Sequence, residues 1–150
     1  MDSFDRHILT LLQDNCRLTN EQIAEQVNLS ATSVRRRIAR LREDGIIIAD
    51  VSLVDPGKLG ITVIVSVTMN EETRQTYSRF KKRMLDADEV TQCYTVSGET
   101  DFIVIAHFRD LPTYEVWIDE YILSDDTIRR SDTNIVYSRF KYATALPVTD

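Results

Sequence analysis

The side chains with the clearest chemical potential form an arginine cluster between Ser30 and Arg42, a segment with five arginines and no acidic residue. Guanidinium groups pair with phosphates and form paired hydrogen bonds with guanine edges. The formal net charge of the chain is −6, but local charge decides whether a polyanion can dock. Residues 1–60 carry 8 basic and 9 acidic side chains, against 10 and 15 in residues 61–150. The acidic excess therefore lies mainly outside the half that holds the cluster.

Three short helices are expected to position this cluster. Apolar residues recur at helical spacing over 4–14. Thr19 begins a second helix as part of a capping box, and Asn28, which tolerates the left-handed conformation, ends it. Ser30 is the N-cap of a third helix that stops at Gly45. Two short helices joined by a tight turn form a helix-turn-helix.

The third helix is predicted to turn its arginines away from the core. Val34, Ile38 and Leu41 recur at positions i, i+4 and i+7 and should face inward. At about 100° per residue, the opposite side carries polar groups suited to the major groove of double-stranded DNA. The candidates for base or groove contact are Thr32, Ser33, Arg36 and Arg40, and the candidates for phosphate contact are Arg35, Arg37 and Arg42. The alternative is a helical bundle whose arginine-rich face is only solvated.

A β ribbon is expected after the third helix. Residues 46–54 are rich in β-branched and apolar side chains and precede the turn 55–57, which contains proline and glycine. This pattern predicts the wing of a winged helix, although no basic residue in it could contact phosphate. The sequence therefore predicts a winged helix-turn-helix domain over 1–54 and a connector over 55–60.

A second domain of different organisation is expected over 61–150. Ile61 to Met69 alternates between apolar and mostly hydroxyl-bearing residues, as a half-buried strand does. Further strands are expected over 90–96, 101–108 and 127–141, and helices over 71–85 and 111–123, the first with Tyr77, Phe80, Met84 and Leu85 on its apolar side. This βαββαβ order is that of the ferredoxin-like fold, so the fold class is α+β. Helices cover one face of such a sheet, and burial of the other face in an oligomer is expected.

The remaining reactive side chains form no catalytic or metal-binding set. His7 and His107 belong to different predicted domains, and the strand pattern makes Cys93 a packed thiol rather than a nucleophile. No Cys or His pair has metal-ligand spacing. Cys16 and Cys93 are expected to be ordinary thiols of a reducing compartment. No signal peptide and no run of ~20 apolar residues is visible, so we expect a cytoplasmic protein with no membrane contact, enzyme activity, cofactor or metal.

Several motifs, in order along the chain, carry a resemblance to a known family. They are Asp5-Arg6-His7-Ile8-Leu9, Leu29-Ser30-Ala31-Thr32-Ser33-Val34-Arg35-Arg36-Arg37-Ile38, Gly45-Ile46-Ile47, Val96-Ser97-Gly98-Glu99-Thr100-Asp101-Phe102 and Ser131-Asp132-Thr133-Asn134-Ile135-Val136. With this set the chain resembles the leucine-responsive regulator and asparagine-activator (Lrp/AsnC) family of bacterial and archaeal transcription factors. The resemblance implies a DNA-binding winged helix and an amino-acid-sensing domain. It also implies homodimers that pair through their sheets, commonly octamers, and effectors bound between dimers.

The same resemblance assigns the turn near residues 98–102 to the effector site. Gly98, Glu99 and Asp101 match the family pattern, whereas Thr100 stands where an aromatic residue is usual. Gly98 would let a ligand approach the backbone, and Asp101 could pair with an α-ammonium group. The candidate effector-binding residues are Gly98, Glu99, Thr100, Asp101, Phe102, Ser131 and Thr133. The alternative is a tight hairpin whose glycine only meets a positive φ requirement.

The expected function is a sequence-specific, DNA-binding transcriptional regulator whose assembly and DNA affinity respond to a small effector, by the resemblance an amino acid. Its partners would be double-stranded DNA, the effector and further copies of the chain in a homodimer or octamer. Two alternatives on the same fold stay open. One is an enzyme similar to sirohaem decarboxylases, which would purify with a bound tetrapyrrole. The other is an architectural protein that compacts DNA without sequence preference.

Overall fold

Two compact units make up the protein, of which the computed structural model describes residues 1–148. The first unit comprises Met1–Leu53 and the tail that begins at Lys141, and the second comprises Val54–Phe140. The sequence interpretation divided the chain after the connector and left the tail with the second domain. Contacts group the tail with the first unit instead.

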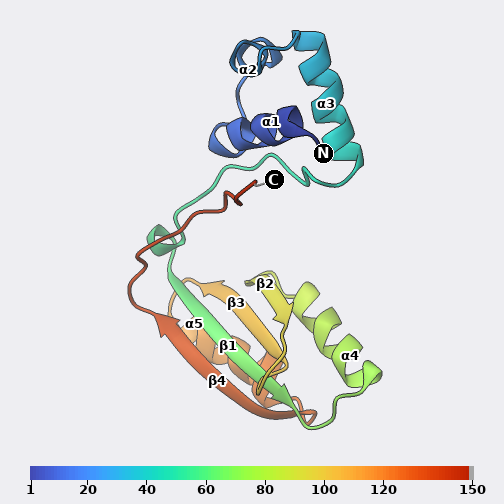
Figure 1. The fold of residues 1–150 in the computed structure, drawn as a ribbon. Coiled ribbons are helices and arrows are strands. Elements are labelled where there is room, and N and C mark those ends of the chain that lie inside the picture. The colour runs from blue at the N-terminus through green and yellow to red at the C-terminus, as the bar shows by residue number, and fades with distance from the viewer. Residues whose placement is uncertain (149–150) are drawn as a thin grey trace. The chain divides into compact units, whose positions relative to one another are not determined.

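The helices of the first unit begin and end where their caps predict (Figure 1). They are α1 (Ser3–Asp14), α2 (Asn20–Val27) and α3 (Ala31–Glu43). The Gln22 N–H donates to the Thr19 hydroxyl at 3.3 Å, and Asn28 ends α2 with a φ of 55°. Gly45, which follows α3, has a φ of 70°. The predicted helix-turn-helix is therefore confirmed. Its bounds could be predicted because capping signals act within a few residues.

The inward faces of these helices form the core of the first unit. The buried residues are Ile8, Leu9, Ile23, Ala24, Val27, Val34, Ile38 and Leu41. Val148 of the tail packs against this cluster. The Gln13 side chain also exchanges two hydrogen bonds with the Leu146 backbone, at 2.7 and 3.0 Å. The tail therefore extends the helical unit.

The β ribbon predicted over 46–54 does not form. In the described chain this segment contains no strand, and Ile48 is 91% exposed. A strand needs a neighbour to take up its backbone hydrogen bonds, and the first unit holds no other strand within residues 1–53 and 141–148. The predicted ribbon is therefore absent from this structure. The segment leads into a short 3₁₀ turn, η1 (Pro56–Lys58).

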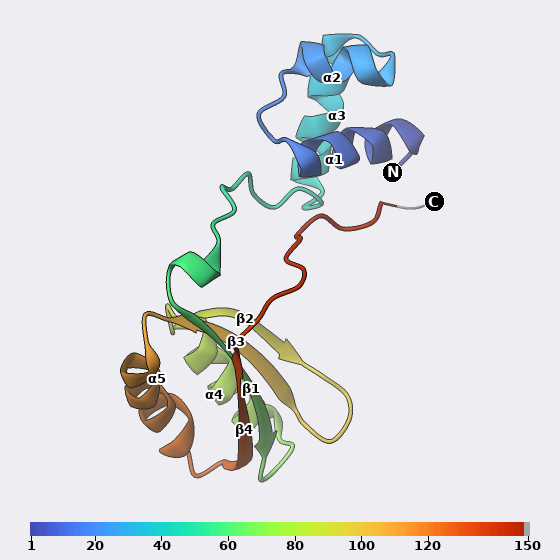
Figure 2. The same ribbon diagram turned by 90° about the vertical axis from the view of Figure 1, so that its left-hand side faces the viewer.

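The second unit is an antiparallel sheet with helices on one face (Figures 1 and 2). Its strands are β1 (Ile61–Met69), β2 (Val90–Thr95), β3 (Phe102–Phe108) and β4 (Ile128–Val136), in the order β2-β3-β1-β4. The covering helices are α4 (Arg74–Leu85) and α5 (Leu111–Ile118), which continues as the π-helical turn η2 (Asp119–Leu123). The predicted ferredoxin-like α+β fold is confirmed.

Alternation along the strands decides which face of the sheet is buried. On β1, Val63, Val65 and Val67 are fully buried against the helices, whereas the residues between them are half-buried. The Phe80 ring of α4 packs on the Phe102 ring of β3 with their centroids 4.6 Å apart. The core of this unit therefore lies between the sheet and its two helices.

The burial of Leu85 and the end of the last strand differ from the sequence prediction for the second unit. Leu85, expected on the apolar side of α4, is 85% exposed. It follows the buried Met84, so a rotation of about 100° carries it off the packed face. The last strand ends at Val136 rather than at residue 141, because Val136 pairs with Thr62 near the start of β1. Beyond that pair only Ile61 of β1 remains, so the strand cannot continue to residue 141.

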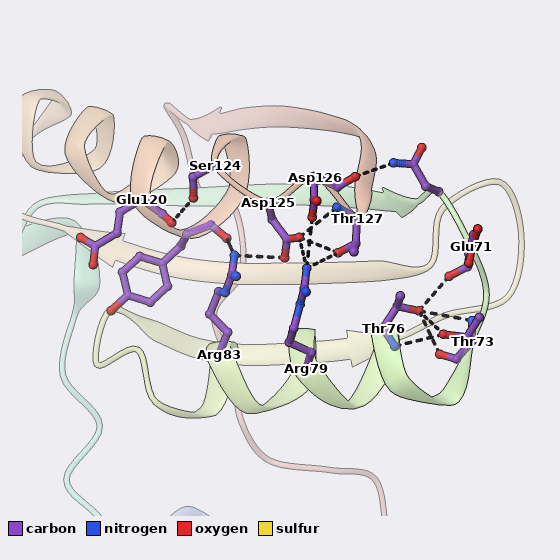
Figure 3. A network of polar contacts seen from close by, with 12 residues as sticks. Glu71, Thr73, Thr76, Arg79, Arg83, Glu120, Ser124, Asp125, Asp126 and Thr127 are labelled. Atoms are coloured by element: carbon purple, nitrogen blue, oxygen red, sulfur yellow. Dashed lines mark hydrogen bonds and ion pairs between the residues drawn. The ribbon is translucent and has the colours of Figure 1, made fainter.

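A buried carboxylate ties α4 to the segment that follows η2 (Figure 3). The Asp125 side chain is fully buried and accepts a hydrogen bond from Arg79 at 2.6 Å, and Arg83 lies 3.1 Å from its second oxygen. Burial by itself would raise the pKa of Asp125, but hydrogen bonds from Thr127 and Arg79 hold this pKa below its usual value. The carboxylate thus stays charged at neutral pH and anchors α4 beside the sheet.

Candidate functional site

The outer face of α3 carries the residues that the sequence assigns to DNA. Thr32 and Arg36 are exposed and lie opposite the buried stripe of the helix, and Arg35 is exposed on its flank. Ser33 is half-buried. Its N–H donates to the Ser30 hydroxyl at 3.2 Å, and its own hydroxyl accepts from that group at 2.9 Å. Ser33 therefore serves the N-cap of α3 as well as its surface.

The arginines of α3 differ in whether a carboxylate accompanies them. Arg42 pairs with Asp50 at 2.7 Å, and both side chains are about half exposed. Exposed pairs of this kind contribute little to stability and exchange readily. Arg35 and Arg36 form no ion pair with any residue in the range 1–148. Their charge is therefore available to an external anion.

A buried carboxylate on α1 binds the other two arginines. Asp5 is fully buried, and its two oxygens accept hydrogen bonds from Arg37 at 2.8 Å and from Arg40 at 2.6 Å. Asp2, the N-cap of α1, accepts a second bond from Arg37 at 2.7 Å. The Arg37 guanidinium also lies 5.5 Å from the centre of the Phe4 ring. Arg37 and Arg40 are therefore largely neutralised by the unit to which they belong.

Hydrogen bonds also decide the protonation state of this cluster. Burial by itself would raise the pKa of Asp5, but bonds from the Asp2 backbone and from Arg37 hold this pKa below its usual value. The carboxylates of Asp5 and Asp2 in turn raise the pKa of Arg37. Sequence reasoning assigned no role to either acid. The only local signal was their spacing, which is that of a capping box, and α1 forms that box.

The turn between β2 and β3 is held by its own residues. Gly98 has a φ of 129°, and the space where a side chain would begin is open. Asp101 accepts hydrogen bonds from a β1 backbone N–H at 2.7 Å and from the Tyr77 hydroxyl. The bond to Asp101 raises the pKa of Tyr77 to about 12. Thr100 donates to a β1 carbonyl at 2.8 Å, and Glu99 is exposed. Each oxygen of Asp101 thus has a donor already.

The structure brings together only part of the predicted effector set. Phe102 is fully buried in the core. Ser131 and Phe102 pair with Val67 from opposite sides, so two strand spacings, about 10 Å, separate them. Thr133 lies further along β4, where its hydroxyl shares a 2.6 Å hydrogen bond with the Tyr114 hydroxyl of α5. Within a single chain, the turn and these two hydroxyls are separate groups.

A shallow hollow lies beside α5 and not at the predicted turn. Its volume is about 420 Å³, and it is lined by Glu89, Pro112, Thr113, Val116, Trp117, Glu120 and Tyr121. The Trp117 and Tyr121 rings stack with their centroids 5.3 Å apart. None of the residues predicted to bind an effector lines this hollow.

Other reactive side chains do not assemble into a site. Cys93 is exposed on the edge strand β2, where only β3 flanks it, so the prediction of a packed thiol was wrong. The His107 Nδ1 atom lies 3.1 Å from the Thr62 hydroxyl on the open face of the sheet. Residues 1–148 contain no group of three or more His, Cys, Asp or Glu that could hold a metal ion. Across the same residues, no helix combines the length and apolar character needed to span a membrane.

A helix-turn-helix with exposed arginines, followed by an α+β unit with an open sheet face, defines a DNA-binding regulator with a ligand-binding domain. Residues 1–48 match the family model "Winged helix-turn-helix DNA-binding", and residues 62–146 match "Lrp/AsnC ligand binding domain". The chain belongs to the Lrp/AsnC family and is a transcriptional regulator.

Similar proteins cover nearly the whole chain. The DNA-binding transcriptional activator DecR of Escherichia coli K12 is 31% identical over 150 residues, which are 99% of each chain. An AsnC family transcriptional regulator from Agrobacterium tumefaciens has a TM-score of 0.90 and 32% identity, covering 99% of this chain and 97% of its own. Transcriptional regulator NMB0573 from Neisseria meningitidis, solved as an L-Met complex, has a TM-score of 0.89 and 29% identity over the same shares.

Proposed function

We propose that this regulator binds operator DNA through α3 and responds to an amino acid bound by its α+β unit. One observation carries the DNA-binding role. Arg36 is exposed on the outer face of α3 and Arg35 on its flank, and neither has an ion pair within residues 1–148. A recognition helix needs such groups, because base edges are read by side chains on its outer face while flanking cations contact phosphates.

The contacts of the individual arginines support different parts in DNA binding. Arg36, with Thr32 one turn before it, is proposed to contact base edges, and Arg35 and Arg42 to contact phosphates. Ser33, Arg37 and Arg40 have partners within their own unit, so we assign them secondary parts in DNA contact.

The effector site proposed here centres on the turn from Gly98 to Asp101. The open space at Gly98 and the exposed Glu99 support access for a small ligand. Asp101 would share its carboxylate between the turn and an α-ammonium group. A similar regulator has been solved with L-Met, which supports an amino acid as the class of ligand. Ser131 and Thr133 would complete such a site from a neighbouring chain, as an effector bound between dimers requires.

Assembly is proposed to begin with a homodimer formed through the open face of the sheet and to continue to an octamer. That face carries the cross-strand pair Ile64 and Ile105, both half-buried in the single chain. A dimer presents two recognition helices, so its operator half-sites should be roughly palindromic and about one helical turn, or a multiple, apart. An effector that prefers one assembly shifts the population toward it and so changes DNA affinity.

We further propose that the protein has no enzyme activity and acts in the cytoplasm, where bacterial DNA lies. Its similarity to named transcriptional regulators supports both proposals.

A thermal-shift screen against the proteinogenic amino acids at millimolar concentration tests the sensing role. A ligand that binds only the folded protein stabilises it by RT ln(1 + [L]/Kd), about 2.7 kcal/mol at a hundredfold excess over Kd. We expect one amino acid, or a few of similar shape, to raise the melting temperature, and Glu99→Ala to weaken this effect. If no amino acid stabilises the protein, the sensing role is rejected and the DNA-binding role stands.

A further inference from the structure

We propose that Asp5 limits the affinity of the protein for DNA of any sequence. By pairing with Arg37 and Arg40, it withholds the charge of these recognition-helix arginines from DNA phosphates and so weakens the part of DNA affinity that does not depend on sequence. The inference rests on the proposed role of α3 in DNA binding.

The contacts of Asp5 make this pairing hard to break. The carboxylate is fully buried, and each of its oxygens accepts one guanidinium hydrogen bond, at 2.8 Å from Arg37 and at 2.6 Å from Arg40. An arginine that left Asp5 for a phosphate would leave a buried charge with one partner fewer. Removing one partner of a buried ion pair is strongly unfavourable.

The two arginines are restrained to different degrees. Arg37 is bound by both Asp2 and Asp5, and its side chain is only 21% exposed. Within residues 1–148 Arg40 is bound by Asp5 alone, and its side chain is 53% exposed. Loss of the Asp5 charge would therefore release Arg40 fully and Arg37 partly, whereas loss of the Asp2 charge would release Arg37 only in part.

The consequence for DNA follows from what phosphate contacts contribute. They are independent of sequence and supply essentially all nonspecific affinity, with a salt dependence of about 0.9 in log K per log salt for each phosphate neutralised. Pairing two cations with carboxylates therefore lowers the affinity for every duplex by a similar factor. Asp5 thus keeps the binding of the protein to DNA outside its operator weak.

The test compares Asp5→Asn with the native full-length chain in DNA titrations between 50 and 200 mM salt. One duplex is the best sequence that the native chain selects from a random library, and the other is a scrambled duplex of equal composition. We expect the salt dependence of Asp5→Asn to be steeper, with the affinity ratio between the two salt concentrations growing about threefold for each released arginine. The affinity for both duplexes should rise by a similar factor at the lower salt concentration.

Matched variants separate this effect from net charge and from folding. Asp14→Asn removes the same charge from the other end of α1, where the carboxylate has no ion pair within residues 1–148, and should leave the salt dependence unchanged. Asp2→Asn alters an exposed N-cap and should steepen the salt dependence of DNA binding less than Asp5→Asn does. When Arg37→Gln and Arg40→Gln are already present, Asp5→Asn should no longer steepen this salt dependence.

Equal weakening of both duplexes at an unchanged salt dependence would assign Asp5 a merely structural role and overturn the inference. If Asp5→Asn does not fold, Asp2→Asn is measured in its place, and an unchanged salt dependence of DNA binding in that variant overturns the inference. Arg36→Ala keeps the two proposals apart. If that change leaves DNA binding intact, the role of α3 itself fails. If it weakens binding while Asp5→Asn and Asp2→Asn leave the salt dependence unchanged, only the role of Asp5 fails.

Discussion

At the scale of single residues, the nearest partners of an arginine decide whether its charge is available to DNA. Arg36 and Arg40 occupy equivalent positions on α3, four residues apart, and both are exposed. Arg40 donates to the buried Asp5, whereas Arg36 has no ion pair within residues 1–148. A short contact to a buried carboxylate outweighs exposure, because it largely cancels the charge that a distant phosphate would meet.

Arg36→Ala should weaken binding to the selected operator by about 1–3 kcal/mol and relax specificity at one base position. The physical reason is the loss of paired hydrogen bonds to a base edge. Fluorescence anisotropy with a panel of single-base operator variants measures both effects.

Arg35→Ala provides the contrast at a neighbouring exposed position. Because Arg35 is proposed to contact phosphate, its loss should weaken binding to all sequences by a similar factor. It should also lower the slope of log K against log salt by about 1. If the two variants gave the same pattern of loss, the division between base and phosphate contacts would be wrong.

At the scale of helices and strands, boundaries follow from side chains next to them in sequence. The N-cap residues that accept a hydrogen bond from the backbone of their helix are Asp2, Thr19, Ser30, Thr73 and Asp110. Alternation set the bounds of β1 equally well. These signals act over one to four residues, so the elements could be predicted before their packing was known.

Asp110, the N-cap of α5, contributes stability to the second unit that is lost at acid pH. Hydrogen bonds from the Thr113 side chain and backbone and from Arg109 lower the pKa of Asp110 to about 2. The unfolded value is about 3.9, so the carboxylate stabilises the fold above about pH 4, and this contribution is lost as pH falls through 2. The destabilisation caused by Asp110→Ala should be constant near neutral pH and shrink between about pH 4 and 2.

Urea unfolding followed by the fluorescence of Trp117, the single tryptophan of the chain, measures this directly. Glu115→Ala, further along α5 and not at its N-cap, is the control and should show no such trend. A destabilisation by Asp110→Ala that did not vary with pH would contradict the assignment.

Asn28 determines how sharply the turn between α2 and α3 is made. Its φ of 55° and ψ of 46° are left-handed, a conformation that costs an ordinary residue about 1–2 kcal/mol. Asn28→Ala should therefore lower the local free energy of opening of α2 by about 1 kcal/mol, and Asn28→Gly should preserve or raise it. Amide hydrogen exchange resolved to α2 and α3 is the appropriate measurement. Equal protection in the two variants would show that the left-handed turn is not under strain.

At the scale of the whole molecule, the two units carry different surfaces. The first exposes the arginines of α3, and the second exposes a sheet face on which Ile64 lies beside Ile105. Two isoleucines side by side on a half-buried sheet face favour contact with a second apolar surface. The proposed dimer would bury them.

Ile105→Lys should therefore shift the protein from dimer to monomer and weaken operator binding, because paired half-sites would no longer be bound together. Light scattering after size-exclusion chromatography gives the mass. Leu85→Lys introduces the same charge at a position that is already 85% exposed at the end of α4, and it should leave the mass unchanged. A dimer that survives Ile105→Lys would rule out this face as the interface.

The sequence by itself determined the helix-turn-helix, the order of helices and strands along the chain and the outward face of α3, because caps and apolar periodicity act between near neighbours. It did not determine whether residues 46–54 would pair as a ribbon, since that depends on a partner strand elsewhere. Only the tertiary structure decided that Asp5 would neutralise Arg40, 35 residues away, and that Thr133 would bond Tyr114 rather than join the turn at Gly98. Such contacts depend on how helices pack, and packing brings together residues whose separation in sequence carries no local signal.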